Sequence, residues 1–226
     1  MTDRILISGA SSGIGLALAR QMLSQGHKVQ GIARDFSKTQ CDGLEQIVCD
    51  LSELNNLPAE LANIEGVPDV LILNAGYGRF GGLEQFSHQQ IRHLIDTNLV
   101  SNLFLLKHFL PLMKMNGGGD IVLVGSESAL QGGKAGAVYC ASKFALRGLA
   151  QSLRKDNPAM RVILVNPGAV DSDFFDDLDF APQTGSEFVL APETVAEAII
   201  QALSLPANAV TEEINIQPLK RSFKKK

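Results

Sequence analysis

Ser8-Gly9-Ala10-Ser11-Ser12-Gly13-Ile14-Gly15 is the stretch of sequence that decides the fold of this chain. It follows a short apolar run at residues 4–8 and precedes residues 14–25, whose apolar side chains recur at helical spacing. Glycines at a strand-to-helix junction let the backbone turn tightly, and an anion can then approach the free N–H groups at the helix N-terminus. The spacing G-x-x-x-G-x-G differs from the G-x-G-x-x-G fingerprint and from a P-loop. We expect a nucleotide to bind here; the alternative is an ordinary glycine-rich turn.

Short apolar runs and longer amphipathic segments alternate along the rest of the chain. The predicted strands are residues 4–8, 28–33, 45–48, 69–73, 120–124, 161–165 and 213–217. The predicted helices are residues 14–25, a long segment from 91 that ends near 117–119, 139–157 and 192–205. Apolar strands that alternate with helices indicate a parallel sheet with both faces covered, and right-handed crossovers make it doubly wound. The sequence therefore predicts an α/β fold: one domain with a doubly wound, seven-stranded parallel sheet (a Rossmann fold) and helices on both faces.

Composition excludes several classes of protein. The chain has 226 residues, 45% of them apolar, and a net charge of −4, which makes a nucleic-acid binder unexpected. It has no run of 18 apolar residues and no signal peptide, so we expect a cytoplasmic protein without a membrane span. Cys41, Cys49 and Cys140 are odd in number and lack motif spacing, which predicts reduced thiols, no disulfide framework and no metal site.

A resemblance to the short-chain dehydrogenase/reductase family rests on motifs that occur in order along the chain. The first turn is similar to the family's T-G-x-x-x-G-x-G, with Ser8 in place of Thr. The further matches are Asn74-Ala75-Gly76, Asn98, Ser126, Tyr139, Lys143 and Pro167-Gly168. The C-terminal part of the chain also looks like the subgroup of small hydroxy-acid and serine dehydrogenases, although that likeness is partial and constrains the substrate weakly.

Tyr139 and Lys143 lie four residues apart on a predicted helix, so their side chains share one face. A phenol has an ordinary pKa near 10. A cation about 4 Å away stabilises the phenolate by roughly 4 kcal/mol at an effective dielectric of 20, while burial acts in the opposite direction. We expect the pair to bring the pKa of Tyr139 toward the operating pH, where acid–base catalysis is most efficient.

The resemblance implies a role for each of four catalytic residues. Ser126 would hydrogen-bond the substrate carbonyl, and Tyr139 would donate the proton. Lys143 would lower the pKa of Tyr139 and hold the ribose hydroxyls, and Asn98 would position a water in the proton relay. The implied activity is an NADP(H)-dependent oxidoreductase that transfers a hydride between nicotinamide and a small carbonyl or alcohol substrate. A non-catalytic NADPH-binding regulator on the same fold is the alternative.

The end of the second predicted strand bears on the choice of cofactor. A dinucleotide site places this strand end beside the adenosine ribose. In the family, a small residue followed by Arg, here Ala33-Arg34, favours NADP, and an acid at the first position favours NAD. Arg34 could instead be a solvated charge, and an alignment shift of one residue would bring Asp35 into play, so NAD(H) stays open as the less favoured cofactor.

The resemblance assigns further cofactor contacts. Asp50 matches the position that hydrogen-bonds the adenine amino group, with Leu51 beside it, and Ser172 takes the usual Thr position near the nicotinamide amide. The full set of expected cofactor-binding residues is Gly9, Ser11, Ser12, Gly13, Ile14, Gly15, Arg34, Asp50, Leu51, Asn74, Ala75, Gly76, Tyr139, Lys143, Pro167, Gly168, Val170 and Ser172. Family members are commonly homodimers or homotetramers, which is the expectation here.

Some features leave alternatives open. Glu127, next to Ser126, either touches substrate or points to solvent, and Ser128 competes with Ser126 if the strand end is shifted. Residues 168–190 read as a substrate lid within a domain spanning residues 1–219. Its crowded aspartates either favour a cationic substrate or belong to a solvated, flexible loop. The basic tail, residues 220–226, is expected to be disordered and solubilising rather than to bind an acidic partner.

Overall fold

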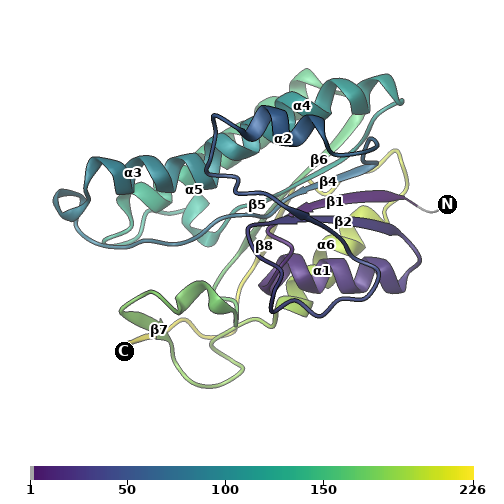
Figure 1. Cartoon of the computed structure of the whole chain (residues 1–226). Coiled ribbons are helices and arrows are strands. Elements are labelled where there is room, and N and C mark those ends of the chain that lie inside the picture. Colours follow the sequence, from purple (N-terminus) through teal and green to yellow (C-terminus); the bar gives the residue numbers. More distant parts are fainter. Residues whose placement is uncertain (1–2) are drawn as a thin grey trace.

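A seven-stranded parallel sheet is the centre of the molecule (Figure 1). Its strands are β1 (Arg4–Ser8), β2 (Lys28–Ala33), β3 (Glu45–Val48), β4 (Val70–Leu73), β5 (Gly119–Val124), β6 (Met160–Pro167) and β8 (Glu213–Ile216). In the computed structural model, which describes residues 3–226, they take the order β3-β2-β1-β4-β5-β6-β8. The predicted α/β class, single domain and doubly wound parallel sheet are confirmed.

Helices cover both faces of the sheet because the central strands are apolar on both sides. On one face lie α1 (Gly13–Ser24) and α6 (Pro192–Leu203), and on the other lie α2 (Leu57–Ala62), α4 (Ser101–Met115) and α5 (Ala137–Asp156) (Figure 1). Each face has its own core: Leu18 and Ile199 belong to the first, and Phe109 and Leu146 to the second. No helix within residues 3–226 is long and apolar enough to cross a membrane.

The long helix predicted from residue 91 is three elements in the structure. These are α3 (His88–Ile95), a π-helical turn at Asp96–Val100, and α4. A π-turn adds one residue to a turn and is frequent at functional sites. The apolar periodicity of the sequence does not predict this π-helical turn, because the apolar side chains on either side of it keep helical spacing.

The strand ends that carry the glycine-containing turns are brought together by the sheet register. β1 lies between β2 and β4, with Ile7 opposite Gly31 and Ile72. The Ser8 hydroxyl accepts hydrogen bonds from the backbone N–H groups of Asn74 and Ala75, both at 3.0 Å. The first turn and the turn after β4 are therefore tied to one another at the carboxyl edge of the sheet.

The lid and the tail are paired, which the sequence did not indicate. β7 (Phe180–Pro182), inside the lid, forms an antiparallel ribbon with β9 (Phe223–Lys225), inside the tail. The expectation of a disordered, purely solubilising tail is wrong. A run of cationic residues has no strand signature of its own, and the pairing depends on a lid strand that lies about forty residues away.

Candidate active site

The first turn has the geometry of an anion site. Gly9 and Gly13 adopt left-handed backbone angles, with φ of +69° and +52°, a region that favours glycine. A Cβ at Gly15 would overlap the carbonyl of Gly9, so the turn and helix α1 can pack this closely only with glycine there. No side chain of the described residues caps α1 at Ser12, which leaves the first N–H groups free to face an anion.

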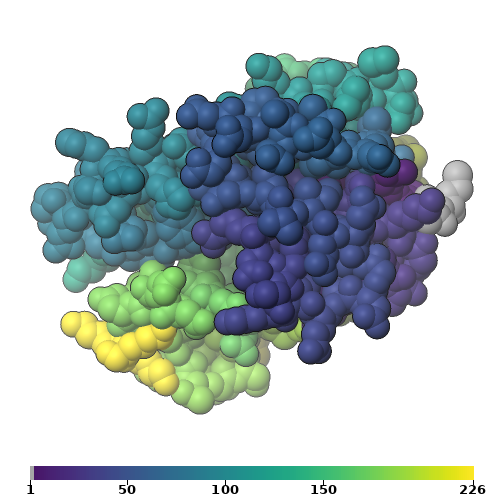
Figure 2. Space-filling model, viewed as in Figure 1, coloured from purple at the N-terminus to yellow at the C-terminus, as the bar shows by residue number. Residues whose placement is uncertain are grey.

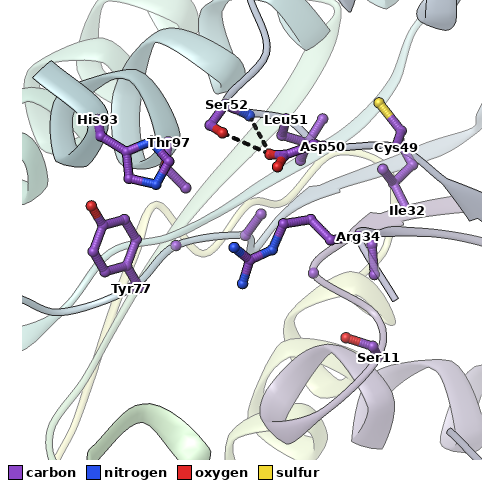
Figure 3. A pocket seen from close by; sticks show the side chains of 14 residues that line it. Ser11, Ile32, Arg34, Cys49, Asp50, Leu51, Ser52, Tyr77, His93 and Thr97 are labelled. Carbon is purple, nitrogen blue, oxygen red and sulfur yellow. Dashed lines mark hydrogen bonds between the residues drawn. The ribbon is translucent and has the colours of Figure 1, made fainter. Parts of the chain in front are cut away.

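A pocket opens between this turn and the ends of β2, β3 and β4 (Figure 3). Figure 3 shows the guanidinium of Arg34 pointing into it, with Asp50 on the far side. Burial raises the pKa of Asp50, but hydrogen bonds from the Ser52 backbone and hydroxyl and the charge of Arg34 outweigh it, so the pKa lies below its ordinary value. The pocket thus has one cationic and one anionic side chain in its lining, as expected for an adenosine site. The lining includes Gly9, Ser11, Ala33, Arg34, Asp50, Leu51, Ala75 and Gly76.

Several pocket residues were not predicted as site residues: Ile32, Cys49, Ser52, Tyr77, His93 and Thr97. Among them, the rings of Tyr77 and His93 contact each other at a tilted angle, with centroids 5.6 Å apart, and Thr97 lies beside them (Figure 3). The Thr97 hydroxyl is buried and has no hydrogen-bond partner among the described residues, so it offers a donor and an acceptor to a bound group. Tyr77 follows the predicted N-A-G motif directly, and this adjacency is the only sequence signal for Tyr77, His93 or Thr97.

Asn98 is fully buried in the π-helical turn, and its side chain holds the backbone of the segment after β4 in place. Its side-chain oxygen accepts from the Tyr77 N–H (3.0 Å), and its amide donates to the Tyr77 carbonyl (2.9 Å). The amide also approaches the Ser142 hydroxyl at 3.3 Å. A Cβ at Gly76 would lie 3.1 Å from the Asn98 side-chain oxygen and 3.5 Å from the Lys143 ammonium, so these groups surround one glycine.

Tyr139 and Lys143 share a face of α5, as their spacing predicts, and both are 5% exposed. The Lys143 ammonium donates to the Val124 carbonyl at 3.1 Å and lies 5.8 Å from the Tyr139 ring centroid. Burial lowers the pKa of Lys143 to about 8. Burial raises the pKa of Tyr139 to about 12. The expectation of a Tyr139 pKa below its ordinary value is wrong in this structure, because burial beside the rings of Phe80 and Phe174 outweighs the hydrogen bond with Ser126.

Ser126, rather than Ser128, faces the tyrosine. A hydrogen bond with Ser126 acts on Tyr139, in the direction of a lower pKa. The Ser126 hydroxyl also accepts from the Ser128 N–H at 3.1 Å, which fixes its orientation at the start of a short 3-10 turn. Glu127 does not simply point to solvent: it lies 3.8 Å from the guanidinium of Arg221 in the tail.

The segment after β6 closes the site on the lid side. The Gly168 N–H donates to the Ile216 carbonyl at 2.8 Å, directly after Pro167. Val170 bridges to Leu190, so the two ends of the lid meet. Ser172 lies next to the first turn, where a Cβ at Gly13 would be 3.3 Å from the Ser172 Cβ. In this way the residues expected around the nicotinamide lie near those expected around the pyrophosphate.

Comparison with known proteins decides the family. The family model for short chain dehydrogenases matches residues 3–181. The chain belongs to the short-chain dehydrogenase family. It is similar to the solved alcohol dehydrogenase of Thermococcus sibiricus complexed with 5-hydroxy-NADP, with 29% identity, a TM-score of 0.86 and coverage of 98% of this chain and 99% of that one.

Two curated relatives of this short-chain dehydrogenase carry different names. Human 17-beta-hydroxysteroid dehydrogenase type 1 is 39% identical over 66% of this chain, and the chain spans half of that relative's length (50%). Sepiapterin reductase of Chlorobaculum tepidum is 29% identical over 96% of this chain and 97% of its own. The kinship to the hydroxy-acid and serine dehydrogenase subgroup stays a prediction.

The site described above fits a nicotinamide dinucleotide. An ammonium carries three donors, and the described residues give Lys143 one acceptor, so two donors remain for hydroxyl groups. The free N–H groups of α1 and the unpartnered Thr97 hydroxyl add further unused hydrogen-bonding capacity along the same edge. Within residues 3–226, no group of three or more histidine, cysteine or acidic side chains is placed to hold a metal ion.

Proposed function

We propose that this short-chain dehydrogenase is an NADP(H)-dependent oxidoreductase that reduces a small carbonyl compound or oxidises the corresponding alcohol. The observation that carries the proposal is the proximity of four side chains: Asn98 and Lys143 lie beside Gly76, Lys143 shares a face of α5 with Tyr139, and Ser126 acts on Tyr139. These four side chains come from three separate segments of the chain, and a protein that only bound a dinucleotide would not need all four for that purpose.

The chain's own residues would supply proton transfer and charge stabilisation. A reduced nicotinamide, held by these residues, would be the source of the hydride for the carbonyl carbon. The Ser126 hydroxyl donates to the carbonyl oxygen and stabilises the negative charge that develops there. Tyr139 transfers its phenolic proton to that oxygen, which completes the alcohol and leaves a phenolate. Lys143 would stabilise this phenolate. Asn98, whose side-chain oxygen accepts from the Tyr77 N–H, would position a water in the relay that returns a proton to Tyr139.

The raised pKa of Tyr139 means that its proton is present for donation, although a phenol with this pKa is a weaker acid than one near the operating pH. With a pKa of about 12, the phenol stays protonated throughout the physiological pH range. The same group acts as base in alcohol oxidation, which is therefore favoured as the pH rises.

Tyr139→Phe tests this assignment because it removes only the phenolic hydroxyl and keeps the ring. We expect turnover of NADPH with any accepted carbonyl to fall by at least about a thousandfold, while NADPH binding stays within a factor of about two, since the ring still packs beneath Phe80 and Phe174. Phe80→Leu, which alters the same aromatic cluster without touching the proton donor, is the matched control. Undiminished turnover in Tyr139→Phe would refute the role of this residue.

Arg34 is the residue proposed to select NADP(H), because its guanidinium faces the pocket opposite Asp50 (Figure 3). In Arg34→Asp, a carboxylate would repel the 2′-phosphate and accept from a 2′-hydroxyl. We expect the dissociation constant for NADPH to rise at least about thirtyfold, or about 2 kcal/mol, and that for NADH to change little. Fluorescence titration of both cofactors measures this. Tighter binding of NADH than NADPH by the unsubstituted protein would contradict the assignment.

Substrate identity calls for a panel of carbonyl compounds. Aldehydes, ketones and 3-oxo acids are tested beside a 17-beta-hydroxysteroid and sepiapterin, since relatives are named for the last two. Tight NADPH binding without turnover of any member would favour the non-catalytic regulator instead. A homodimer or homotetramer, and a cytoplasmic location, stay predictions.

A further inference from the structure

The C-terminal residues 220–226 lie across the lid and are bonded to it along their length. Figure 2 shows the yellow C-terminal end of the chain against the green lid. Backbone hydrogen bonds run from Gln183 to Ser222 (2.9 Å), from Lys220 to Glu187 (2.8 Å) and from Lys226 to Asp179 (2.9 Å). These contacts flank the β7–β9 ribbon on both sides, so the tail holds the lid as an added strand would.

Side-chain contacts also join the tail to the lid and to the turn after β5. The Lys226 ammonium donates to the carbonyl oxygens of Phe175 and Asp176, beside the acidic residues of the lid. Arg221 reaches Glu127, next to Ser126, at 3.8 Å. The tail thus contacts both the lid and the catalytic side of the cleft. It also places cationic residues beside the aspartates of the lid, for which the sequence left open either a cationic substrate or a solvated loop.

Aromatic rings connect the tail to the catalytic tyrosine. Phe223 contacts Phe180, with ring centroids 5.7 Å apart, and Phe180 contacts Phe80 at 5.2 Å. Phe80 in turn lies 5.2 Å from Tyr139. A continuous series of ring contacts therefore joins the tail to the covering of Tyr139.

Phe174 occupies the space directly over the reaction centre. Its ring lies 5.8 Å from the Tyr139 ring, and its edge rests on Gly78, where a Cβ would be 2.9 Å from the Phe174 Cε1. The walls of this space are the Gly78 backbone and the rings of Phe80 and Tyr139. Such walls suit a flat apolar group, and at present a phenyl ring of the chain itself fills them.

We propose that residues 220–226 hold the lid closed with Phe174 inserted in a ring-sized substrate subsite, and that the flat apolar ring of a carbonyl substrate replaces the Phe174 ring when the lid moves. The inference deepens the proposed function and rests on it for the identity of the reaction centre. It assigns Phe174 to specificity and the tail to control of access.

Binding of a ring-bearing ketone to Phe174→Ala tests the subsite. The probes are acetophenone and the ring-free acetone, titrated against the full chain by NMR without turnover. We expect acetophenone to bind at least fivefold more tightly to Phe174→Ala than to the unsubstituted protein, because its ring need not displace Phe174, whereas acetone binding is unchanged. Phe144→Ala, which removes an exposed ring of α5 outside the Tyr139 cluster, should bind both probes as the unsubstituted protein does. Equal or weaker acetophenone binding to Phe174→Ala overturns the subsite.

Truncation after Leu219 tests the role of the tail independently. We expect hydrogen exchange of the lid amides in residues 173–189 to quicken at least tenfold, with no change in β5 or α1. Exchange that stays unchanged overturns the strap, and exchange that quickens throughout the chain also counts against it. Both measurements are independent of hydride transfer. If acetophenone binds as expected but no carbonyl is reduced, the proposed function fails and the subsite stands. If a carbonyl is reduced but Phe174→Ala does not bind acetophenone more tightly, the subsite fails and the proposed function stands.

Discussion

The buried ammonium of Lys143 lowers the free energy of unfolding, although the residue belongs to the candidate active site. Its ammonium is 5% exposed and burial lowers its pKa to about 8, because the charged form loses hydration. The neighbouring tyrosine shifts in the opposite direction for the same physical reason. Both shifts disfavour charge at the site in this structure, and a bound group with hydroxyl acceptors would relieve the cost at Lys143.

Lys143→Met is therefore expected to stabilise the protein at pH 7. The folded-state pKa of about 8 lies below that of an unfolded lysine. Below pH 8 the burial cost of the ammonium is fully present, and it is relieved as the pH rises toward about 10.5. We expect the free energy of unfolding to increase by about 1–3 kcal/mol at pH 7, with the gain shrinking between pH 8 and pH 10. Urea denaturation of both proteins at pH 7 and at pH 10 measures this difference. A Lys143→Met variant less stable than the unsubstituted protein at pH 7 would contradict the expectation.

At the scale of elements, Ser8 couples β1 to the turn after β4. The hydroxyl is 1% exposed and accepts from two backbone N–H groups, those of Asn74 and Ala75. Asn74 in turn donates to the carbonyls of Ser8 and Gly9, so the two turns brace each other. The turns that would contact pyrophosphate and nicotinamide ribose are thus held by reciprocal hydrogen bonds across adjacent strands.

Ser8→Ala would leave two buried N–H donors without an acceptor. We expect the free energy of unfolding to fall by about 1–3 kcal/mol and NADPH binding to weaken at least threefold, since Asn74-Ala75-Gly76 lines the site. Ser8→Thr keeps the hydroxyl and is the control. Thermal unfolding and cofactor titration measure both effects. Full retention of stability and affinity in Ser8→Ala would show that other contacts hold the turn.

The elements themselves were largely predictable. The strands β1, β2 and β3 have the bounds that their apolar runs indicate, and the ends of α1, α5 and α6 fall within two residues of those expected. The short helix α2 escaped prediction, because six residues give too little periodicity to recognise. The π-turn at Asn98 escaped because its extra residue changes side-chain direction without changing composition.

At the scale of the whole molecule, the tertiary fold determines which distant segments come into contact, and local sequence patterns do not predict those contacts. Tyr77, His93 and Thr97 meet in one pocket although nothing in their spacing relates them to Arg34 or Asp50 (Figure 3). The tail and lid pair in the same way, as two segments that lie far apart along the chain. Each segment has little tendency to form a strand alone, and each becomes one because the other supplies its backbone partners.

The sequence by itself determined the parallel sheet, the glycine turn and the order of the motifs, because local periodicity and the backbone freedom of glycine act over a few residues. The tertiary structure alone decided the direction of the Tyr139 pKa shift, the contact of Glu127 with Arg221 and the seating of Phe174 over the reaction centre. Those properties depend on burial and on contacts between distant segments. The local periodicity of a sequence predicts neither of them.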